Sequence, residues 1–290
     1  MRRKYALLFV AFWGVLLTGC FKEDDINVGD QHYKRVYDTT SSDPVWKYVP
    51  EFKEGEKKKI TIRDLLTMSG GLNWDEAYAS LFSVTTHGYY GNDLYELVTG
   101  LDVIEEPGKR FSYRSGDTQI LAFVVEKATG KTISDYAEEK LWRPMQAGQD
   151  AYWLLDKKDG DEKSFCCFHT TAREVARFAR LMLHHGNWNG KQLISEDYIN
   201  EAMSPARYLK DEWGKDSLDY YGFQIWIMNY HGQRNPYFRG MLGQYIIAIP
   251  ERNAIIVRLG HKKDEKRIRE TTRDVYRYMD IGMKILDNRQ

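Results

Sequence analysis

Cysteine and histidine are the residue types that could hold a soft metal ion, and they meet at Cys166-Cys167-Phe168-His169. A structural zinc site needs four ligands in paired spacings, and the sequence offers no second pair. A bridge between the two cysteines is not expected, because adjacent Cα atoms lie about 3.8 Å apart and disulfides usually span about 4.4–6.8 Å. We therefore predict no metal site, and small buried apolar side chains at Cys166 and Cys167.

Common nucleotide-binding and metallohydrolase motifs are missing: the sequence has no GxxxxGK[ST], no GxGxxG after a strand and no HExxH. His184 and His185 are neighbours near a predicted helix end, where they complement the helix dipole and do not face one another. The lysine-rich runs 53–59 and 262–267 contain acidic residues, which is typical of solvated faces. We predict no cofactor and no nucleic-acid partner.

The third cysteine, Cys20, follows Arg2-Arg3-Lys4 and the apolar run 6–17. This run is shorter than the roughly 20 residues that span a bilayer. Leu17-Thr18-Gly19-Cys20 resembles the bacterial lipobox, in which the signal is cut before the cysteine and the thiol carries a diacylglycerol; the alternative is a secretory signal that contains a cysteine. We expect a signal peptide over 1–19, a polar tether over 20–42, lipid attachment at Cys20 with a membrane anchor, and a bacterial cell-envelope location.

Helix punctuation is clear from residue 60 onward. Thr61-x-x-Asp64 predicts a capping box, and Gly70-Gly71 ends that helix. Three further helices are predicted, with apolar residues at helical spacing. Their predicted starts are Asp117, Thr132 and Thr171.

Strand patterns follow the helices. Residues 223–229, 243–249 and 254–260 are predicted as strands, the last two joined by a hairpin connection at 250–253. A final helix is predicted over 271–286. This order predicts an α+β fold, an antiparallel sheet flanked by helices together with a helical lobe.

Composition fits a folded globular chain. The 290 residues include 42 Lys and Arg against 42 Asp and Glu, so the formal net charge is 0, and the chain lacks the broad basic field of nucleic-acid binders. Hydrophobic residues make up 42% and charged residues 29%, which excludes disorder over most of the length.

The stretch Ile60-Thr61-Ile62-Arg63-Asp64-Leu65-Leu66-Thr67-Met68-Ser69-Gly70-Gly71-Leu72 resembles the signature helix and turn of the beta-lactamase-related serine hydrolases. That family includes class C beta-lactamases, D-aminopeptidases, esterases and 6-aminohexanoate-oligomer hydrolases. Further blocks agree in the same order, and together they assign a domain over 43–290. These blocks are residues 43–52, 107–115, 165–183 with 190–195, and 242–251.

The resemblance implies a serine beta-lactamase-like fold and a three-part site. Ser-x-x-Lys supplies the acylated serine and a basic amine on one helix face. A Tyr-x-Asn or Tyr-x-Ser turn moves protons, and a Lys-Thr-Gly-type strand helps form the oxyanion hole. The second part implies Tyr113 and Ser115 as catalytic residues; the alternative for Tyr113 is an ordinary core tyrosine.

The strand part is matched only partly, because no Lys or His occupies the motif. The resemblance implies substrate-binding residues in this region, where Arg239 is the nearest cation. They are Arg239, Gly240, Gly243 and Gln244.

The Ser-x-x-Lys part is absent, because no serine in the sequence is followed three positions later by lysine. The chain resembles a family member whose N-terminal portion is deleted between the signal and Asp43, and we expect an open strand edge and an uncovered apolar sheet face. Two functions remain. One is an envelope lipoprotein that hydrolyses a small amide or ester, such as a peptidoglycan fragment, by an acyl-enzyme route if the nucleophile segment is present. The other is a non-catalytic envelope lipoprotein whose cleft binds a ligand or partner.

Overall fold

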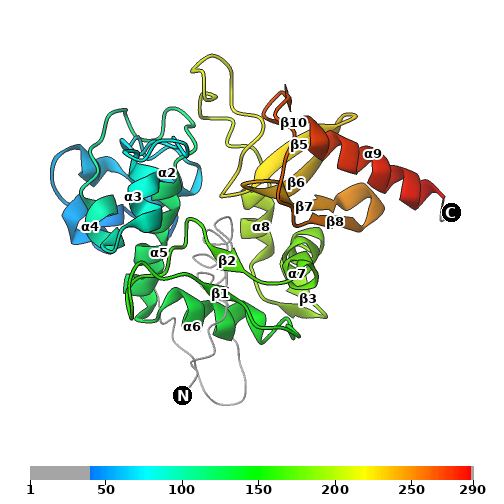
Figure 1. Ribbon diagram of the computed structural model, residues 1–290, viewed down its shortest axis with the longest axis horizontal. Coiled ribbons are helices and arrows are strands. Elements are labelled where there is room, and N and C mark those ends of the chain that lie inside the picture. The colour runs from blue at the N-terminus through cyan, green and yellow to red at the C-terminus, as the bar shows by residue number, and fades with distance from the viewer. Residues whose placement is uncertain (1–39, 289–290) are drawn as a thin grey trace.

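The structure is a computed structural model and describes residues 40–288. The signal peptide, Cys20 and residues 20–39 of the tether, all predicted from the sequence, lie outside the described residues. Figure 1 shows a helical part around α2, α3 and α4 on the left and a sheet with α9 beside it on the right.

Helices dominate the first two thirds of the described chain. The element α6 continues directly into a π-helical turn at Glu138–Trp142. The α-helices are α2 (Ile62–Leu66), α3 (Val84–Tyr90), α4 (Leu94–Thr99), α5 (Ser115–Thr129), α6 (Ile133–Ala137), α7 (Ala172–Leu183), α8 (Glu196–Ala202) and α9 (Arg273–Asp287).

The predicted capping box at the start of α2 is confirmed. The backbone N–H of Asp64 donates to the Thr61 hydroxyl over 3.2 Å, and the N–H of Thr61 donates to the Asp64 carboxylate over 2.8 Å. Thr132 and Thr171 likewise accept from the third residue of α6 and of α7. These caps satisfy N–H groups that have no partner inside a helix.

The predicted start of α5 at Asp117 is wrong. The helix begins two residues earlier, at Ser115, and Asp117 is fully buried inside the first turn. The sequence pattern misplaced the start because Asp is a common capping residue, and nothing local shows that this one faces the core. The predicted end is confirmed, since Gly130 closes the helix with φ of 67°.

A four-stranded antiparallel sheet carries the C-terminal half, which confirms the predicted α+β fold. Its strands pair in chain order. They are β5 (Trp226–Tyr230), β6 (Gln233–Gly240), β7 (Gln244–Ile249) and β8 (Ala254–Arg258). Two-stranded ribbons complete the β-structure: β1 (Tyr152–Trp153) with β2 (Phe168–His169), β3 (Asn187–Trp188) with β4 (Lys191–Gln192), and β9 (Arg267–Ile268) with β10 (Thr271–Thr272).

The strand β6 was not predicted from the sequence. Its residues include Arg234, Asn235 and Pro236, so the alternation of a half-buried strand is missing and a proline stands inside the run. Pairing on both sides overrides this weak local preference. The strand matters for the site because it carries Arg239 and Gly240.

Both faces of the sheet are covered, so the expected uncovered apolar face is wrong. The helix α7 lies against β7 and β8 on one face, where Ile246 and Ala248 join the core of Val175 and Phe178. On the other face the side chains pack with α9; they include Tyr245, Ile247, Val275 and Met279. Within residues 40–288, β8 pairs only with β7, so its outer edge is open.

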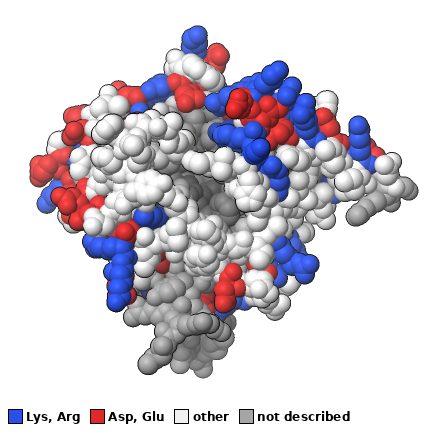
Figure 2. Space-filling view, viewed as in Figure 1, with Lys and Arg blue, Asp and Glu red and all other residues white. Residues whose placement is uncertain are grey.

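Charged side chains ring the face shown in Figure 2, with Lys and Arg interleaved with Asp and Glu. The surface around the central hollow of this face is mostly uncharged. Among the helices of residues 40–288, none combines the length and the apolar character needed to cross a bilayer.

Candidate active site

The turn that carries Tyr113 is held between two distant segments. The backbone N–H of Ser112 donates to the carbonyl of Met68 over 2.8 Å, and that of Phe111 donates to the carbonyl of Lys210 over 2.9 Å. The chain then enters α5 at Ser115. This places Tyr113 and Ser115 at the N-terminal end of a 15-residue helix whose first turns are buried.

A carboxylate from a distant loop caps this helix end. Glu76 accepts hydrogen bonds from the backbone N–H of Ser115 over 2.5 Å and from its hydroxyl over 3.1 Å. The hydroxyl of Tyr78 donates to the same carboxylate. A negative group at a helix N-terminus is stabilised by unpaired N–H groups and by the helix dipole. Burial nevertheless raises the pKa of Glu76 above its usual value.

Tyr113 stands in an aromatic pocket. Its ring stacks on Trp226 at 5.6 Å between centroids and meets Tyr221 edge to face at 6.4 Å. Burial raises the pKa of Tyr113, the charge of Glu76 raises it further and Arg239 lowers it. The phenol is therefore protonated at neutral pH, and it lies within electrostatic reach of both a carboxylate and a guanidinium.

Of the residues predicted to bind substrate, Arg239 is brought to this pocket. Its guanidinium lies 3.6 Å from the centroid of the Trp226 ring, a close cation–π contact. It also donates to the carbonyl of Glu270 over 2.6 Å. Arg239 thus shares the Trp226 ring with Tyr113.

The predicted glycine and glutamine residues have mainly structural contacts. Gly243 has φ of 87° in the turn between β6 and β7, a conformation that favours glycine. Its carbonyl accepts from Arg258 over 2.5 Å. The side-chain amide of Gln244 exchanges two hydrogen bonds with the backbone of Gly260, and Gly240 stands opposite Gln244 in the ladder. These contacts hold the strand ends, and substrate binding by these residues stays a prediction.

A second cation beside the turn is already paired. Arg114, nearly fully buried, donates to Glu105 over 2.8 Å, and Arg110 donates to the same carboxylate over 2.5 Å. Breaking a buried ion pair leaves an uncompensated charge. This network fixes the backbone on both sides of Tyr113.

Asp117 adds a buried carboxyl one turn into α5. One of its oxygens accepts from the N–H of Gly70 over 3.1 Å, and the other has no partner among the described residues. Burial raises the pKa of Asp117 from 3.8 to about 7. The folded chain therefore holds this proton at pH values where the unfolded chain has released it.

Asp117→Asn should remove one source of pH dependence from stability. Since the folded-state pKa is raised, the stabilisation is complete below pH 3.8 and is lost as pH rises to about 7. The free energy of unfolding should fall by up to about 1.4 kcal/mol per pH unit across this window and then level off. Urea unfolding at several pH values checks this, because the curves of wild type and variant should diverge. Parallel curves would contradict a buried proton at Asp117.

Cys166 and Cys167 form a disulfide with their Cα atoms 3.8 Å apart, so the prediction of two unbridged, buried cysteines is wrong. Both are only partly buried. The Cα-spacing rule describes cysteines that lie apart in the chain, whereas at adjacent positions the backbone itself adapts. Cys167 lies in the left-handed region, with φ of 66°. In residues 40–288 no group of three His, Cys, Asp or Glu could hold a metal ion.

A sequence profile described as beta-lactamase matches residues 39–278. The chain belongs to the beta-lactamase family. This match confirms the resemblance drawn from the sequence, and it covers the Tyr113 turn, α5 and the whole sheet.

Named relatives agree with beta-lactamase family membership. A 6-aminohexanoate-dimer hydrolase of Paenarthrobacter ureafaciens is 26% identical over 235 residues, 76% of this chain and 59% of that protein. A candidate D-alanyl-D-alanine carboxypeptidase of Escherichia coli K12 is 30% identical over 112 residues, 36% of this chain and 25% of that protein. The chain thus spans only part of the length of these curated relatives.

A solved structure supports the beta-lactamase-type fold. A candidate 6-aminohexanoate-dimer hydrolase from Bacillus anthracis superposes with a TM-score of 0.77 at 21% identity. The superposition covers 98% of this chain and 72% of that one. At this identity the likeness establishes the shared fold.

Two residues that contact the candidate site were not predicted from the sequence. Glu76 and Tyr78 lie 39 and 37 positions before Ser115, and only the fold brings them to it. The available signal was a carboxylate flanked by aromatic residues, Trp74 and Tyr78, directly after the Gly70-Gly71 turn. That pattern is too common in loops to single out a site.

Proposed function

We propose that this protein hydrolyses a small amide or ester by an acyl-enzyme route when a Ser-x-x-Lys segment completes the site. The observation that carries the proposal is the Tyr113 turn: a partly buried phenol at the N-terminal end of α5, within electrostatic reach of Glu76 and stacked on Trp226. The family membership and the named hydrolase relatives support it.

In this mechanism Tyr113 acts as a neutral proton donor. Its pKa is raised by burial and by Glu76, so the phenol keeps its proton until a base accepts it. A lysine ammonium beside the hydroxyl would oppose both effects, because a nearby opposite charge favours the phenolate. Tyr113 would then pass its proton to the leaving group of the amide or ester, while Ser115 and Glu76 hold the turn in place.

The proposed substrate class rests on the family membership and on the named relatives. We propose a small-molecule amide or ester, with peptidoglycan-derived amides as the specific candidate. The similarity to a candidate D-alanyl-D-alanine carboxypeptidase supports that choice.

The alternative is a non-catalytic lipoprotein that binds a ligand or partner in the retained cleft. It is favoured by one observation, that no serine of the sequence precedes a lysine by three positions. The genomic locus discriminates the two functions. An in-frame Ser-x-x-Lys upstream of the Asp43 codon supports hydrolysis, and an uninterrupted signal peptide and tether with no such motif supports the binding role.

We also propose that Cys20 carries a lipid that anchors the protein in the bacterial cell envelope. Cys20→Ala should abolish both the incorporation of a fatty-acid label and the partitioning into detergent, since two acyl chains suffice for stable anchoring. Labelling of cells that express the full chain, followed by Triton X-114 phase separation, measures both. Wild-type protein that takes up no label and stays in the aqueous phase would refute the anchor.

A further inference from the structure

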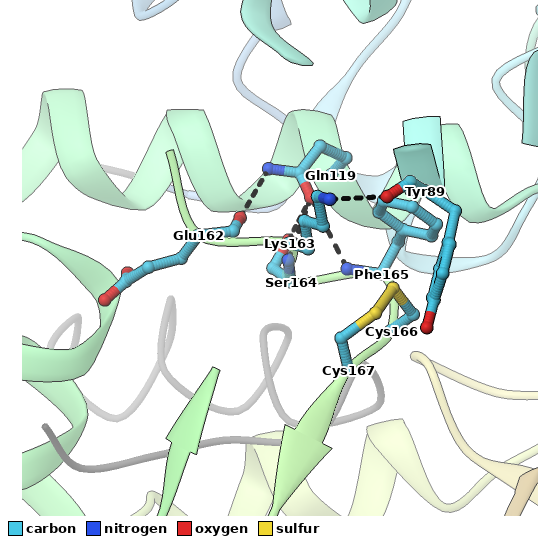
Figure 3. The surroundings of a disulfide bond; sticks show 8 residues. All are labelled: Tyr89, Gln119, Glu162, Lys163, Ser164, Phe165, Cys166 and Cys167. Atoms are coloured by element: carbon cyan, nitrogen blue, oxygen red, sulfur yellow. Dashed lines mark hydrogen bonds between the residues drawn. A yellow bond between two sulfur atoms is a disulfide. The ribbon is translucent and has the colours of Figure 1, made fainter. Parts of the chain in front are cut away.

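The Cys166–Cys167 disulfide sits on a segment that α5 holds (Figure 3). The side chain of Gln119, from the first half of α5, accepts from the N–H of Ser164 over 2.9 Å and donates to the carbonyl of Glu162 over 3.0 Å. Beyond the disulfide the chain enters β2. The disulfide therefore lies between one point fixed on α5 and one fixed in a ribbon.

Contacts lead from the disulfide to the helix end at the candidate site. Phe165, the residue before Cys166, packs edge to face on Trp74 at 5.6 Å between ring centroids. Trp74 in turn lies against the residue after Ser115, since a Cβ on Gly116 would come within 2.8 Å of its ring. Phe165 and Trp74, which we call the Trp74 wall, thus connect the disulfide to the first turn of α5.

This disulfide contributes little to the free energy of unfolding. The entropy that a cross-link removes from the unfolded chain grows with the length of the loop it closes, and adjacent cysteines close the shortest loop. What the bond fixes is local. Cys167 has φ of 66°, a region that non-glycine residues avoid, and the bond holds the backbone there.

We propose that Cys166–Cys167 is a redox-sensitive modification site, opened by a dithiol reductant, whose opening loosens the Trp74 wall beside Ser115. A thiolate of the reductant attacks one sulfur, the S–S bond breaks and a mixed disulfide forms. The second thiol of the reductant then displaces the protein sulfur. The protein gains two electrons and two protons as two thiols, and the reductant becomes a cyclic disulfide. Partial exposure of both cysteines gives the reductant access.

The first experiment establishes the redox state. Full-length protein is purified with a thiol-blocking agent, and part of it is treated with dithiothreitol and then iodoacetamide. Peptide mapping should find that the blocking agent has not modified Cys166 or Cys167. After reduction, iodoacetamide should alkylate both cysteines. Two blocked thiols before reduction would overturn the proposal.

The second experiment follows amide hydrogen exchange in the two states. Reduction should speed exchange about tenfold or more at Phe165, Trp74 and Gly116, because local opening becomes easier. Exchange in α7 should not change. If these amides exchange equally fast in the oxidised and the reduced protein, the disulfide does not affect the Trp74 wall and the proposal is wrong.

Two double variants separate the bond from the backbone conformation. Cys166→Ser with Cys167→Ser should exchange like the reduced protein, whereas Cys166→Ser with Cys167→Gly should exchange like the oxidised one, because glycine adopts this φ freely. Neither should respond to dithiothreitol. Identical exchange in the two variants would refute the conformational role. No readout requires hydrolysis, so the result is independent of the proposed function.

Discussion

Tyr113→Phe should lower the rate of ester hydrolysis by about 100- to 10,000-fold in a chain completed by a Ser-x-x-Lys segment. The phenol is the proposed proton donor to the leaving group, and Phe removes only its hydroxyl while keeping the stack on Trp226. The assay fuses a family-type N-terminal segment before Asp43 and measures kcat with p-nitrophenyl acetate.

Matched variants make this result specific. Tyr230→Phe removes a hydroxyl that bonds Asp280 at the far end of β5 and should leave the rate unchanged. Replacing the serine of the added segment by alanine should abolish turnover to the residual level left by binding groups. If Tyr113→Phe leaves the fused chain as active as its parent, Tyr113 is a core tyrosine, the alternative that the sequence left open.

Gln224→Ala should lower the free energy of unfolding by about 2–4 kcal/mol. Gln224 lies fully buried just before β5, where its amide donates to the carbonyl of Leu65 over 2.9 Å and accepts from the Thr118 hydroxyl over 2.9 Å. Alanine would leave the Leu65 carbonyl and the Thr118 hydroxyl buried, each without its hydrogen bond to Gln224. Each such loss costs about 1–3 kcal/mol. The helical part and the sheet would lose a direct link.

Urea unfolding with equal m-values would measure this loss, and Gln233→Ala is the control. Gln233 is exposed at the start of β6, and its replacement should change stability by less than about 0.5 kcal/mol. If the two variants unfold at the same urea concentration, Gln224 does not link the two parts of the molecule.

Local chemistry explains which elements were predictable. At Thr61, Thr132 and Thr171 the capping side chain and the N–H that it binds lie within four residues of each other. The local sequence is therefore enough to predict these caps. The strand β6 depends on pairing with two neighbours and carries Pro236, so its local pattern misleads. The fold class survives this error because three other strands and the final helix keep their own signals.

The same distinction between local and long-range signals applies to the candidate site. Tyr113, Ser115 and Arg239 could be named as candidates because they lie in or near blocks that resemble a family. Glu76 could not, because its contact with Ser115 joins residues 39 positions apart. The disulfide was excluded by a spacing rule that does not foresee the left-handed backbone of Cys167.

This chain carries the tyrosine part of the proposed hydrolase site without the Ser-x-x-Lys motif of the nucleophile. Incubation of the purified full chain with a fluorophosphonate probe, followed by intact-mass measurement, tests it most directly. With no Ser-x-x-Lys to activate a hydroxyl, the protein should show no stoichiometric adduct. The fused chain with Ser-x-x-Lys should acquire one adduct on the added serine. A stoichiometric adduct on a serine of the unextended chain, with Ser115 the first to map, would contradict the account.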